Sequence, residues 1–439
     1  MPQPSITRRA LWISTVEGSW ATLHFALTSG AFFTGFALML GANDFQLGWL
    51  SAIPLLAQVF QLPGGYFVEK TGWRRPVVAW FSVVSRSLWL PIALIPLMSA
   101  DHRIRGFGLL YAASCVVMNF AVTPWIAWMS SLVPPAIRGR YFGTRNRIAA
   151  VVGAVAALIG GVVIDAFNDR GYETSGYLTI FLVAVLAGLA AFRLILRQPD
   201  PGYRAEQLPA LGSYVLQPLR DANFRRILVF TLYWMFAVNM ASPFFNAHLI
   251  KHLQWSYKAI QGMGLLTALC SILAQKTWGR MVDRHGHKPV LTICVVGILQ
   301  LPFYYALCPW DVRWPIYANA VFTGIFWAGF GLASFNQLIA SLPASRRAAY
   351  IAILSALTGI TNFVATTFSG WLADQWVGVR WQIGPLTVVN YQLLFVVTGL
   401  LRVPALLLLR RIHEPAARGT RDVVREMLRD FVELRGLNW

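Results

Sequence analysis

A charged motif of ten residues occurs twice in this chain, and each copy lies between two long apolar segments. The first copy is Gly65–Arg74 (GYFVEKTGWR) and the second is Gly279–Lys288 (GRMVDRHGHK). Both read G-x-x-x-acid-base-x-G-x-base, and the second begins 214 residues after the first, at 279 against 65. A polar motif that recurs half a chain apart in an apolar sequence indicates two equivalent halves that cross a membrane.

The apolar runs are long enough to be membrane spans. Of the 439 residues, 56% are hydrophobic and 13% are charged, which is about half the charged share of a soluble domain. A hydrocarbon core of about 30 Å requires roughly 20 residues of helix. The predicted spans are 14–41, 45–68, 76–98, 106–132, 142–166, 176–197, 226–250, 259–282, 289–309, 315–342, 349–373 and 387–409. We therefore expect an all-α integral membrane protein, with twelve transmembrane helices in two six-helix pseudo-symmetric halves, rather than a barrel of short alternating strands.

The net charge of +19 follows membrane topology rather than a nucleic-acid surface. With both termini inside, 28 of the 37 basic residues fall in segments on the inner side and seven on the outer side. The other two, Arg86 and Arg402, lie within apolar runs. This bias obeys the positive-inside rule. It predicts a multi-pass protein of the cell (inner) membrane with both termini cytoplasmic and no nucleic-acid partner.

The longest polar interruption divides the chain into parts. The predicted domains are an N-terminal six-helix half (1–197), a cytoplasmic linker (198–224), a C-terminal six-helix half (225–410) and a cytoplasmic tail (411–439). In the tail, apolar residues from Val423 to Leu434 are spaced as on one helix face, which predicts an amphipathic helix. The match between Gly161–Asp165 and Gly370–Asp374 supports a duplication of the two halves.

The 6+6 spans, the central linker and the duplicated motif resemble the major facilitator superfamily of secondary transporters, over essentially the whole chain. The resemblance implies that helices 1, 4, 7 and 10 surround a central cavity. The chain also departs from common family patterns. Glu69 stands where the family usually has Asp, and Met129–Leu132 lacks the acid often found there. Asn119 lies near the position of a proton-coupling arginine, and Ala156–Ala157 replace the Gly-Pro of drug antiporters. These departures weaken an interpretation as a proton-coupled drug exporter.

We expect the two motif copies to gate the cytoplasmic side. A carboxylate at Glu69 or Asp283 would face neighbouring helix N-termini, whose dipoles favour a negative charge, and nearby basic residues could pair with it. The glycines would let backbones approach closely. The alternative is a topological anchor without a gating part. The residues assigned to the gate are Gly65, Glu69, Lys70, Gly72, Arg74, Gly279, Asp283, Arg284, Gly286 and Lys288.

Polar and aromatic residues inside the apolar runs are candidates for substrate or ion binding, because such polar groups are costly in lipid. Glu17, His24 and Thr28 lie on roughly one face of the first helix. Glu17 is the leading candidate for a proton or cation site, with an interfacial position as the alternative. His24 could titrate near neutral pH or serve only in packing. The other candidates are Arg86, Asn119, Thr123, Tyr233, Trp234, Asn239, Asn319, Thr323, Trp327 and Asn336.

Arg86 is unusual because it lies near the middle of the third span. A buried arginine needs a carboxylate or several carbonyl groups, which Glu17 or a substrate anion could supply. A structural partner is our interpretation, and substrate binding is the alternative. No metal site is expected, since His248 and His252 offer only two ligands. The four cysteines all lie in apolar runs and are interpreted as reduced packing residues.

Together these features predict a secondary active transporter that moves a small organic solute by alternating access between the two halves. Proton coupling is one version of this function, and an energy-independent facilitator or a lipid flippase on the same fold are the alternatives. An enzyme is not expected, because the sequence has no H-E-x-x-H, no G-x-S-x-G and no paired intramembrane carboxylates. The expected partners are a small-molecule substrate, membrane lipid and, in a coupled transporter, protons. We expect a monomer without a cofactor.

Overall fold

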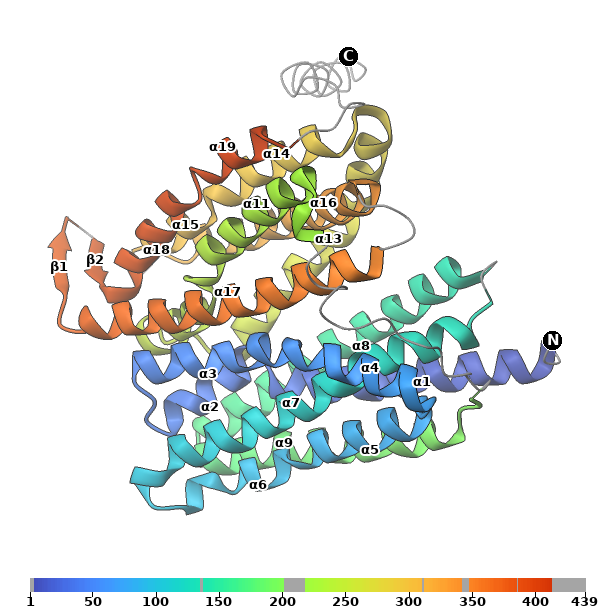
Figure 1. Ribbon diagram of the computed structural model, residues 1–439. Helices are drawn as coiled ribbons and strands as arrows, with labels where there is room; N and C mark the ends of the chain where they lie inside the picture. Colours follow the sequence, from blue (N-terminus) through green and yellow to red (C-terminus); the bar gives the residue numbers. More distant parts are fainter. Residues whose placement is uncertain are drawn as a thin grey trace, which may run out of the picture. The chain divides into compact units, whose positions relative to one another are not determined.

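The computed structural model is almost entirely helical, with a single two-stranded sheet in its described part (Figure 1). It describes residues 4–134, 137–200, 218–309, 312–341, 347–384 and 386–412. Linker residues 201–217 and tail residues 413–439, with the predicted amphipathic helix, lie outside the described residues.

The chain forms two compact units. Unit 1 consists of Met1–Ala210, Pro243–Gly262 and Gly359–Asp374, and unit 2 of Leu211–Ser242, Met263–Thr358 and Gln375–Trp439. Unit 1 therefore combines the N-terminal half of the sequence with two short segments from the C-terminal half. The division into domains at 1–197 and 225–410 stays a prediction.

The first half of the chain forms long helices with short breaks. They are α1 (Pro4–Thr28), α2 (Gly30–Met39), α3 (Asp44–Ala57), η1 (Gln58–Phe60), α4 (Gln61–Thr71), α5 (Arg74–Ser87), α6 (Trp89–Ala93), η2 (Ile95–Leu97), α7 (Ala100–Leu132), α8 (Arg138–Asn168) and α9 (Glu173–Arg197). Gly30, at a φ of +61°, separates α1 from α2 in a conformation that glycine adopts without strain. Asn43 starts α3 through a reciprocal capping box with Gln46.

The second half contains more interruptions. Its elements are η4 (Pro218–Arg220), α11 (Ala222–Asn239), α12 (Ser242–Ala247), the π-helix η5 (His248–His252), α13 (Tyr257–His285), α14 (His287–Leu299), α15 (Leu301–Ala306), α16 (Trp314–Ser341), α17 (Arg347–Gln375), β1 (Arg380–Ile383), β2 (Leu386–Val389), α18 (Asn390–Leu401) and α19 (Ala405–Arg410). Pro302 stands at the start of α15, where its missing N–H leaves no helical hydrogen bond unmade.

Among the described residues, eleven helical segments are long and apolar enough to cross a membrane. They match eleven of the twelve predicted spans with small shifts at the ends. The one predicted span without a match is the eleventh, 349–373, which lies in α17, a 29-residue helix that is not among these eleven segments. The predicted start at residue 387 is wrong, because 386–389 form strand β2 and the helix begins at Asn390.

Strands β1 and β2 pair antiparallel, with Arg380 opposite Val389 and Ile383 opposite Leu386. Gly384 lies in the turn with a φ of +58°, as tight hairpin turns require. Four-residue strands are too short to give a clear alternating pattern, so the sequence did not predict this hairpin.

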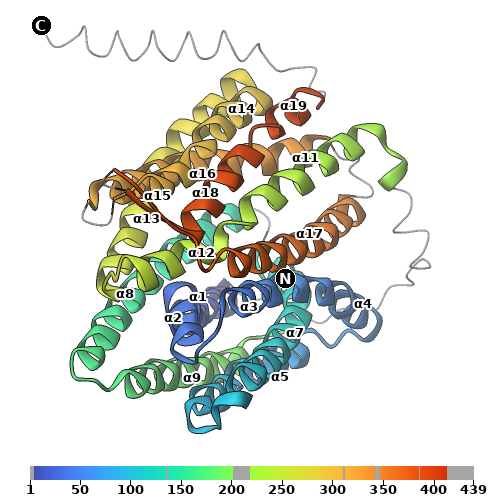
Figure 2. The ribbon, with the colours of Figure 1, turned by 90° about the vertical axis from the view of Figure 1, so that its left-hand side faces the viewer.

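In unit 1, α1 packs against α8 and α9, while α5 packs against α7 and α9 (Figure 2). Aromatic rings fill the space between these helices. Phe36 lies at the centre, with its ring centroid 5.0 to 5.3 Å from those of Phe107, Tyr177 and Phe181. Such tilted and edge-on pairs add to the stabilisation from buried area.

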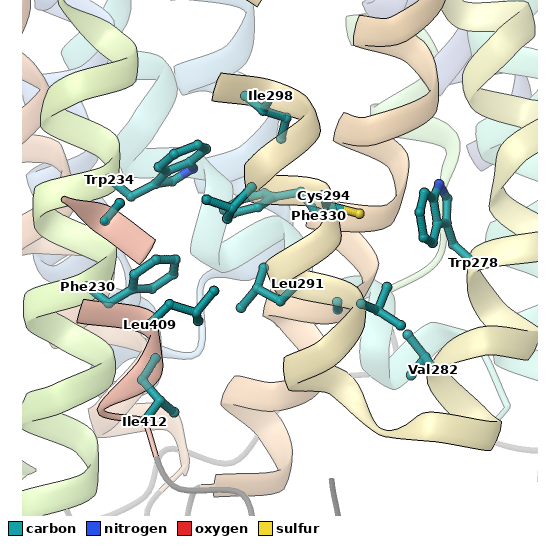
Figure 3. Close-up of a cluster of buried hydrophobic side chains, with 14 of the residues drawn as sticks. Phe230, Trp234, Trp278, Val282, Leu291, Cys294, Ile298, Phe330, Leu409 and Ile412 are labelled. Atoms are coloured by element: carbon teal, nitrogen blue, oxygen red, sulfur yellow. The ribbon is translucent and has the colours of Figure 1, made fainter. Parts of the chain in front are cut away.

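In unit 2, α14 packs against α16, and α11 packs against α18 and α19. Their facing side chains form a hydrophobic core that includes Phe230, Trp234, Cys294 and Phe330 (Figure 3). Trp234 is fully buried in this core. The core therefore fixes the two ends of the C-terminal half, α11 and α19, against each other.

Candidate functional site

A buried carboxylate in α1 lies between two arginines. Glu17 Oε1 is 3.9 Å from Arg86 Nη2, and Glu17 Oε2 is 3.5 Å from Arg145 Nη2. The Glu17 residue is only 3% exposed, so the interfacial alternative does not fit this structure. Buried charges are tolerated when they are paired, and here one acid faces two bases. The three side chains, here called the charge cluster, carry a net charge of +1 when all are ionised.

Glycines make room for the charge cluster. A Cβ atom at Gly18 would collide with the Arg145 guanidinium, and a Cβ atom at Gly188 would lie 2.8 Å from Arg86 Cβ. The guanidinium carbon of Arg145 also lies 4.9 Å from the centroid of the Trp125 ring, which is a cation–π distance. Arg145 on α8 is therefore held by groups from both α1 and α7.

His24 and Thr28 are buried but make other contacts. His24 Nδ1 is 2.9 Å from the Ala184 carbonyl oxygen, and its ring meets Trp89 edge-on with centroids 6.3 Å apart. The Thr28 hydroxyl donates to the His24 carbonyl at 2.8 Å. These contacts correspond to the packing alternative for His24.

Asn119 and Thr123 belong to a network between α4 and α7. Gln61 Nε2 donates to Asn119 Oδ1 at 2.9 Å, and the Thr123 hydroxyl donates to the Gln61 carbonyl at 3.1 Å. A Cβ atom at Gly65 would lie 2.9 Å from the Thr123 methyl group. The first glycine of the first motif copy thus allows α4 to approach α7 closely.

The candidates in unit 2 lie on α11 and α16. The Tyr233 hydroxyl donates to the Leu401 carbonyl at 2.8 Å. Asn239 Nδ2 donates to the Met235 carbonyl at 2.9 Å. Trp234 packs near Trp327, with ring centroids 6.5 Å apart. Because Trp234 is fully buried in the core, stacking on a substrate would require it to leave that core.

Two further candidates on α16 are linked to each other. Asn319 Nδ2 donates to the Leu301 carbonyl at 2.7 Å, and its Oδ1 accepts from the Thr323 hydroxyl at 3.1 Å. Asn336 lies near the end of α16 and is half-buried. Asn319 thus joins α16 to α15 in the way that interhelical asparagines commonly do.

The two motif copies share a backbone feature. Gly72 has a φ of +75° and Gly286 a φ of +89°, a region that residues other than glycine rarely adopt. Gly72 ends α4, and Gly286 lies between α13 and α14. The second glycine of the motif is therefore where both connections turn.

The basic residues of the motif copies make hydrogen bonds of their own. Arg74 Nη1 donates to Ser131 Oγ at 2.8 Å, near the C-terminal end of α7. Lys288 Nζ donates to the carbonyls of Arg410 and Ile412, at 3.0 and 2.7 Å. Both residues thus tie the motif copies to neighbouring helices.

The remaining gate residues are mostly exposed. Lys70, Asp283 and Arg284 are exposed, and no described cation lies within 4.0 Å of the Asp283 carboxylate. At Gly279, no described atom outside its own helix backbone lies within 4 Å of the position of a Cβ. Glu69 lies in α4, but its side chain is outside the described part. The gating role of the motif copies stays a prediction.

A second set of acid and glycine contacts lies at the other end of unit 1, the end that the charge bias predicts to be outer. Asp165 Oδ1 accepts the Tyr257 N–H at 2.7 Å, and Oδ2 accepts the Lys258 N–H at 2.9 Å. A Cβ atom at Gly161 would lie 3.0 Å from the Lys258 nitrogen. The sequence Gly161-x-x-x-Asp165 thus places its glycine and its acid on the first turn of α13.

In the matching segment Gly370–Asp374, the glycine also makes a close contact with the start of another helix. A Cβ atom there would lie 2.9 Å from Gly48 Cα and 3.0 Å from the Asp44 carbonyl oxygen, at the first turns of α3. Nearby, Lys251 Nζ is 3.1 Å from Asp44 Oδ1. Each of these contacts joins the N-terminal half of the sequence to segment 243–262 or 359–374, both within unit 1. We call them the outer contacts.

Tyr257 anchors the outer contacts in the aromatic core of unit 1. Its hydroxyl lies 2.7 Å from that of Tyr177, and its ring stacks on Phe32 with centroids 6.1 Å apart. The residue is 5% exposed. The start of α13 is therefore held by a buried ring and by an acid on its backbone.

Sequence reasoning missed Arg145 and Asp165 as candidates. Both lie inside the predicted span 142–166, so the rule that flagged Glu17 and Arg86 applies to them too. Instead, Arg145 was counted with the inner charges. In the described part, no group of three or more potential metal ligands occurs, and none of the four cysteines forms a disulfide.

The helical spans and buried polar residues define a polytopic membrane protein of the transporter type. A family profile described as Major Facilitator Superfamily matches residues 19–247 and 227–436. The chain belongs to the Major Facilitator Superfamily. A comparison with curated proteins gives no match.

Solved structures of transporters share the fold. A point mutant of the nucleoside transporter NupG is 12% identical, with a TM-score of 0.72 over 92% of this chain and 100% of that chain. A bacterial homologue of the iron transporter ferroportin is 14% identical, with a TM-score of 0.70 over 94% and 99%. The xylose transporter XylE from E. coli is 16% identical, with a TM-score of 0.69 over 95% and 99%. At these identities the likeness shows the fold alone.

Proposed function

We propose that this protein is a secondary transporter that moves a small organic solute across the membrane by alternating access, with proton coupling at Glu17. The observation that carries the coupling proposal is the burial of Glu17 between Arg86 and Arg145. A buried carboxylate in a membrane span is costly and is by default a functional group. Glu17 also lies on the first helix, which the family resemblance places beside the central cavity.

The charge cluster links protonation to movement. If Glu17 took up a proton while both arginines stayed in place, the buried Arg86 and the partly buried Arg145 would both lack a counter-charge. Removing one partner from a buried ion pair costs about 3–5 kcal/mol. Protonation of Glu17 should therefore accompany a shift of Arg145 or the arrival of an anion. A coupling site needs such a dependence between charge and conformation.

The outer contacts supply a reversible closure. They consist of hydrogen bonds from backbone N–H groups to Asp165, an ion pair between the exposed Lys251 and the buried Asp44, and close packing at glycines. A helix cap contributes only about 1 kcal/mol, and Lys251 is exposed to solvent, so the set can form and break in a transport cycle. We propose that the outer contacts hold one state and that the two motif copies hold the opposite one.

Solved structures with the same fold suggest the first substrates to test. The solved structures include a nucleoside transporter and a D-xylose–proton symporter. Nucleosides and pentoses are compact polar solutes, whose hydroxyl groups suit a half-buried amide such as that of Asn119. Uridine and D-xylose are therefore the probes of choice.

The experiment measures uptake of labelled uridine and D-xylose into liposomes that contain the purified protein, with and without an imposed pH step. We expect the wild type to accumulate one probe when the side of entry is acidic. Glu17→Gln should abolish accumulation and retain part of the exchange without a gradient. The control Glu173→Gln makes the same chemical change at an exposed position and should behave as the wild type.

Each alternative has its own outcome. Equal responses of the wild type and Glu17→Gln would show that the proton-site assignment is wrong. Uptake that equilibrates without regard to pH would indicate a facilitator. Failure of the wild type to move either probe would contradict the proposed substrate classes.

A further inference from the structure

Three arginines surround an open pocket between α11 and α19 in unit 2. The pocket has a volume of about 340 Å³, more than ten times the share of about 30 Å³ that one water takes in the liquid. It lies at the first turns of α11 and the last turn of α19, at the ends of two membrane-crossing segments. The lining residues are Ala222, Arg225, Arg226, Val229, Leu408 and Arg411.

The packing of α11 directs the first two arginines into the pocket. Asp221 caps the helix by accepting the N–H groups of Asn223 and Phe224, at 2.8 and 3.0 Å. Phe224, Ile227 and Phe230 are buried on one side of the helix. Arg225 and Arg226 are exposed, because they occupy the turn between these apolar positions. The cap and the core thus set the orientation of the helix.

The end of α19 is fixed in a similar way. Leu409 and Ile412 point into the core of unit 2, near Phe230 (Figure 3). Leu408 and Arg411 consequently lie on the pocket side. Lys288, the last base of the second motif copy, donates to the carbonyls on either side of Arg411, those of residues 410 and 412. The backbone that carries Arg411 is therefore held in place.

The pocket has an excess of positive charge. No described carboxylate lies within 4.0 Å of the guanidinium groups of Arg225, Arg226 or Arg411. Three like charges around one pocket repel each other, and a bound anion would relieve that repulsion. Guanidinium groups are also the preferred partners of phosphate oxygens, which they can contact in a bidentate manner.

The lining of the pocket also includes exposed apolar surface. Val229 is 52% exposed and follows Arg225 by one helical turn, while Leu408 precedes Arg411 by nearly one turn. The charged groups lie near the membrane surface, where they match the headgroup of a phospholipid. The apolar groups lie one turn deeper, where they match its glycerol and acyl region. A soluble anion would gain nothing from the apolar part.

We propose that this pocket binds the headgroup phosphate of an anionic glycerophospholipid in the inner leaflet. The positive-inside bias assigns both helix ends to the cytoplasmic face, where the leaflet carries anionic lipid. Basic pockets between membrane helices on this face are suited to such headgroups. The site is independent of the charge cluster and of the substrate.

The test uses the purified full-length protein in detergent, with phosphatidylglycerol or phosphatidylcholine of identical acyl chains added. Native mass spectrometry then measures the lipid that remains bound. The test variant is Arg225→Gln/Arg226→Gln/Arg411→Gln. Its control, Arg193→Gln/Arg197→Gln/Arg280→Gln, removes the same charge from exposed arginines elsewhere.

We expect the wild type and the control to retain phosphatidylglycerol in preference to phosphatidylcholine. Each arginine near the surface should contribute about fivefold in affinity, so the triple variant should lose about a hundredfold. A lysine triple variant at the same positions should retain most of the preference and checks that the sites tolerate substitution.

Three results would overturn the proposal. The first is equal retention of the two lipids by the wild type, which requires no variant. The second is a loss in the control as large as in the test variant. The third is complete displacement of phosphatidylglycerol by millimolar inorganic phosphate, which would indicate a site for the free anion.

Discussion

Asp165 caps the helix that begins at Tyr257, since its Oδ1 accepts the Tyr257 N–H at 2.7 Å. Its second oxygen accepts the next N–H, that of Lys258, at 2.9 Å. The first turn of a helix has N–H groups without partners and a partial positive charge. A carboxylate from the end of α8 thus satisfies the start of α13, although the two residues are 92 positions apart. This contact gives the first prediction.

Replacing Asp165 by alanine should weaken the outer contacts. The change removes both capping hydrogen bonds, which should cost about 1–2 kcal/mol, and should lower the midpoint of thermal unfolding in detergent. Asp169→Ala serves as the control, because Asp169 lies one turn away and is exposed. Equal midpoints for the two variants would show that the cap adds nothing to stability.

A methyl group at Gly370 should disturb the same region by steric conflict. Its Cβ would lie 2.9 Å from Gly48 Cα and 3.0 Å from the Asp44 carbonyl oxygen. These are backbone atoms that cannot move aside, so Gly370→Ala should cost about 1–3 kcal/mol. In the control Gly331→Ala, no described atom lies within 4 Å of the new methyl group. Thermal unfolding of both variants tests this, and a stability of Gly370→Ala equal to that of the control would contradict it.

The membrane orientation can be tested at exposed positions of the described helices. In a background without the four native cysteines, Arg197→Cys, at the end of the span, should react with a membrane-impermeant thiol reagent only from the cytoplasmic side. Arg170→Cys should react only from outside, because α9 crosses the membrane between the two positions. Reversed labelling of the two variants would show that the orientation predicted from the charge bias is wrong.

Much of the fold could be predicted from the sequence because membrane spans are set by length and apolarity. The repeat also identified Gly72 and Gly286 as equivalent, and both have positive φ. Charge balance pointed to Glu17 as a partner of Arg86, since no other acid lies well inside a predicted span. The structure places the two side chains 3.9 Å apart.

Other parts of the site could not be recognised from a single sequence. Arg145 belongs to a run of arginines that the positive-inside rule already explains, so its pairing with Glu17 was not expected. The partners of Asp165 are backbone N–H groups, which nearly every residue type offers. Gly18 is one of 35 glycines, and only the path of the Arg145 side chain shows why it matters.

Substitution of Gly18 should separate Arg145 from Glu17. A Cβ at this position would collide with the Arg145 guanidinium, so Gly18→Ala should displace that side chain without removing any charge. We expect proton-driven accumulation to fall while the folded protein stays stable, because the clash is with the end of a flexible side chain that can move aside. Gly143→Ala is the control, since it lies on the same helix as Arg145 and its new methyl group meets no described atom within 4 Å. Unchanged accumulation in Gly18→Ala would mean that the position of Arg145 has no part in coupling.

The charge cluster makes a prediction about stability that requires no substrate. With all groups ionised, the wild type has a net charge of +1 in the cluster, Glu17→Gln has +2, and Arg145→Gln has 0. Loss of Glu17 leaves the buried Arg86 and the partly buried Arg145 without an acid, and removal of the partner of a buried charge costs about 3–5 kcal/mol. Loss of Arg145 leaves Glu17 paired with Arg86 and should cost less.

The double variant Glu17→Gln/Arg145→Gln returns to +1, so adding Arg145→Gln to Glu17→Gln should recover part of the stability. Thermal unfolding of the four proteins in one detergent measures this coupling, as in a double-mutant cycle. Additive losses in the double variant would show that Glu17 and Arg145 do not interact in the folded protein.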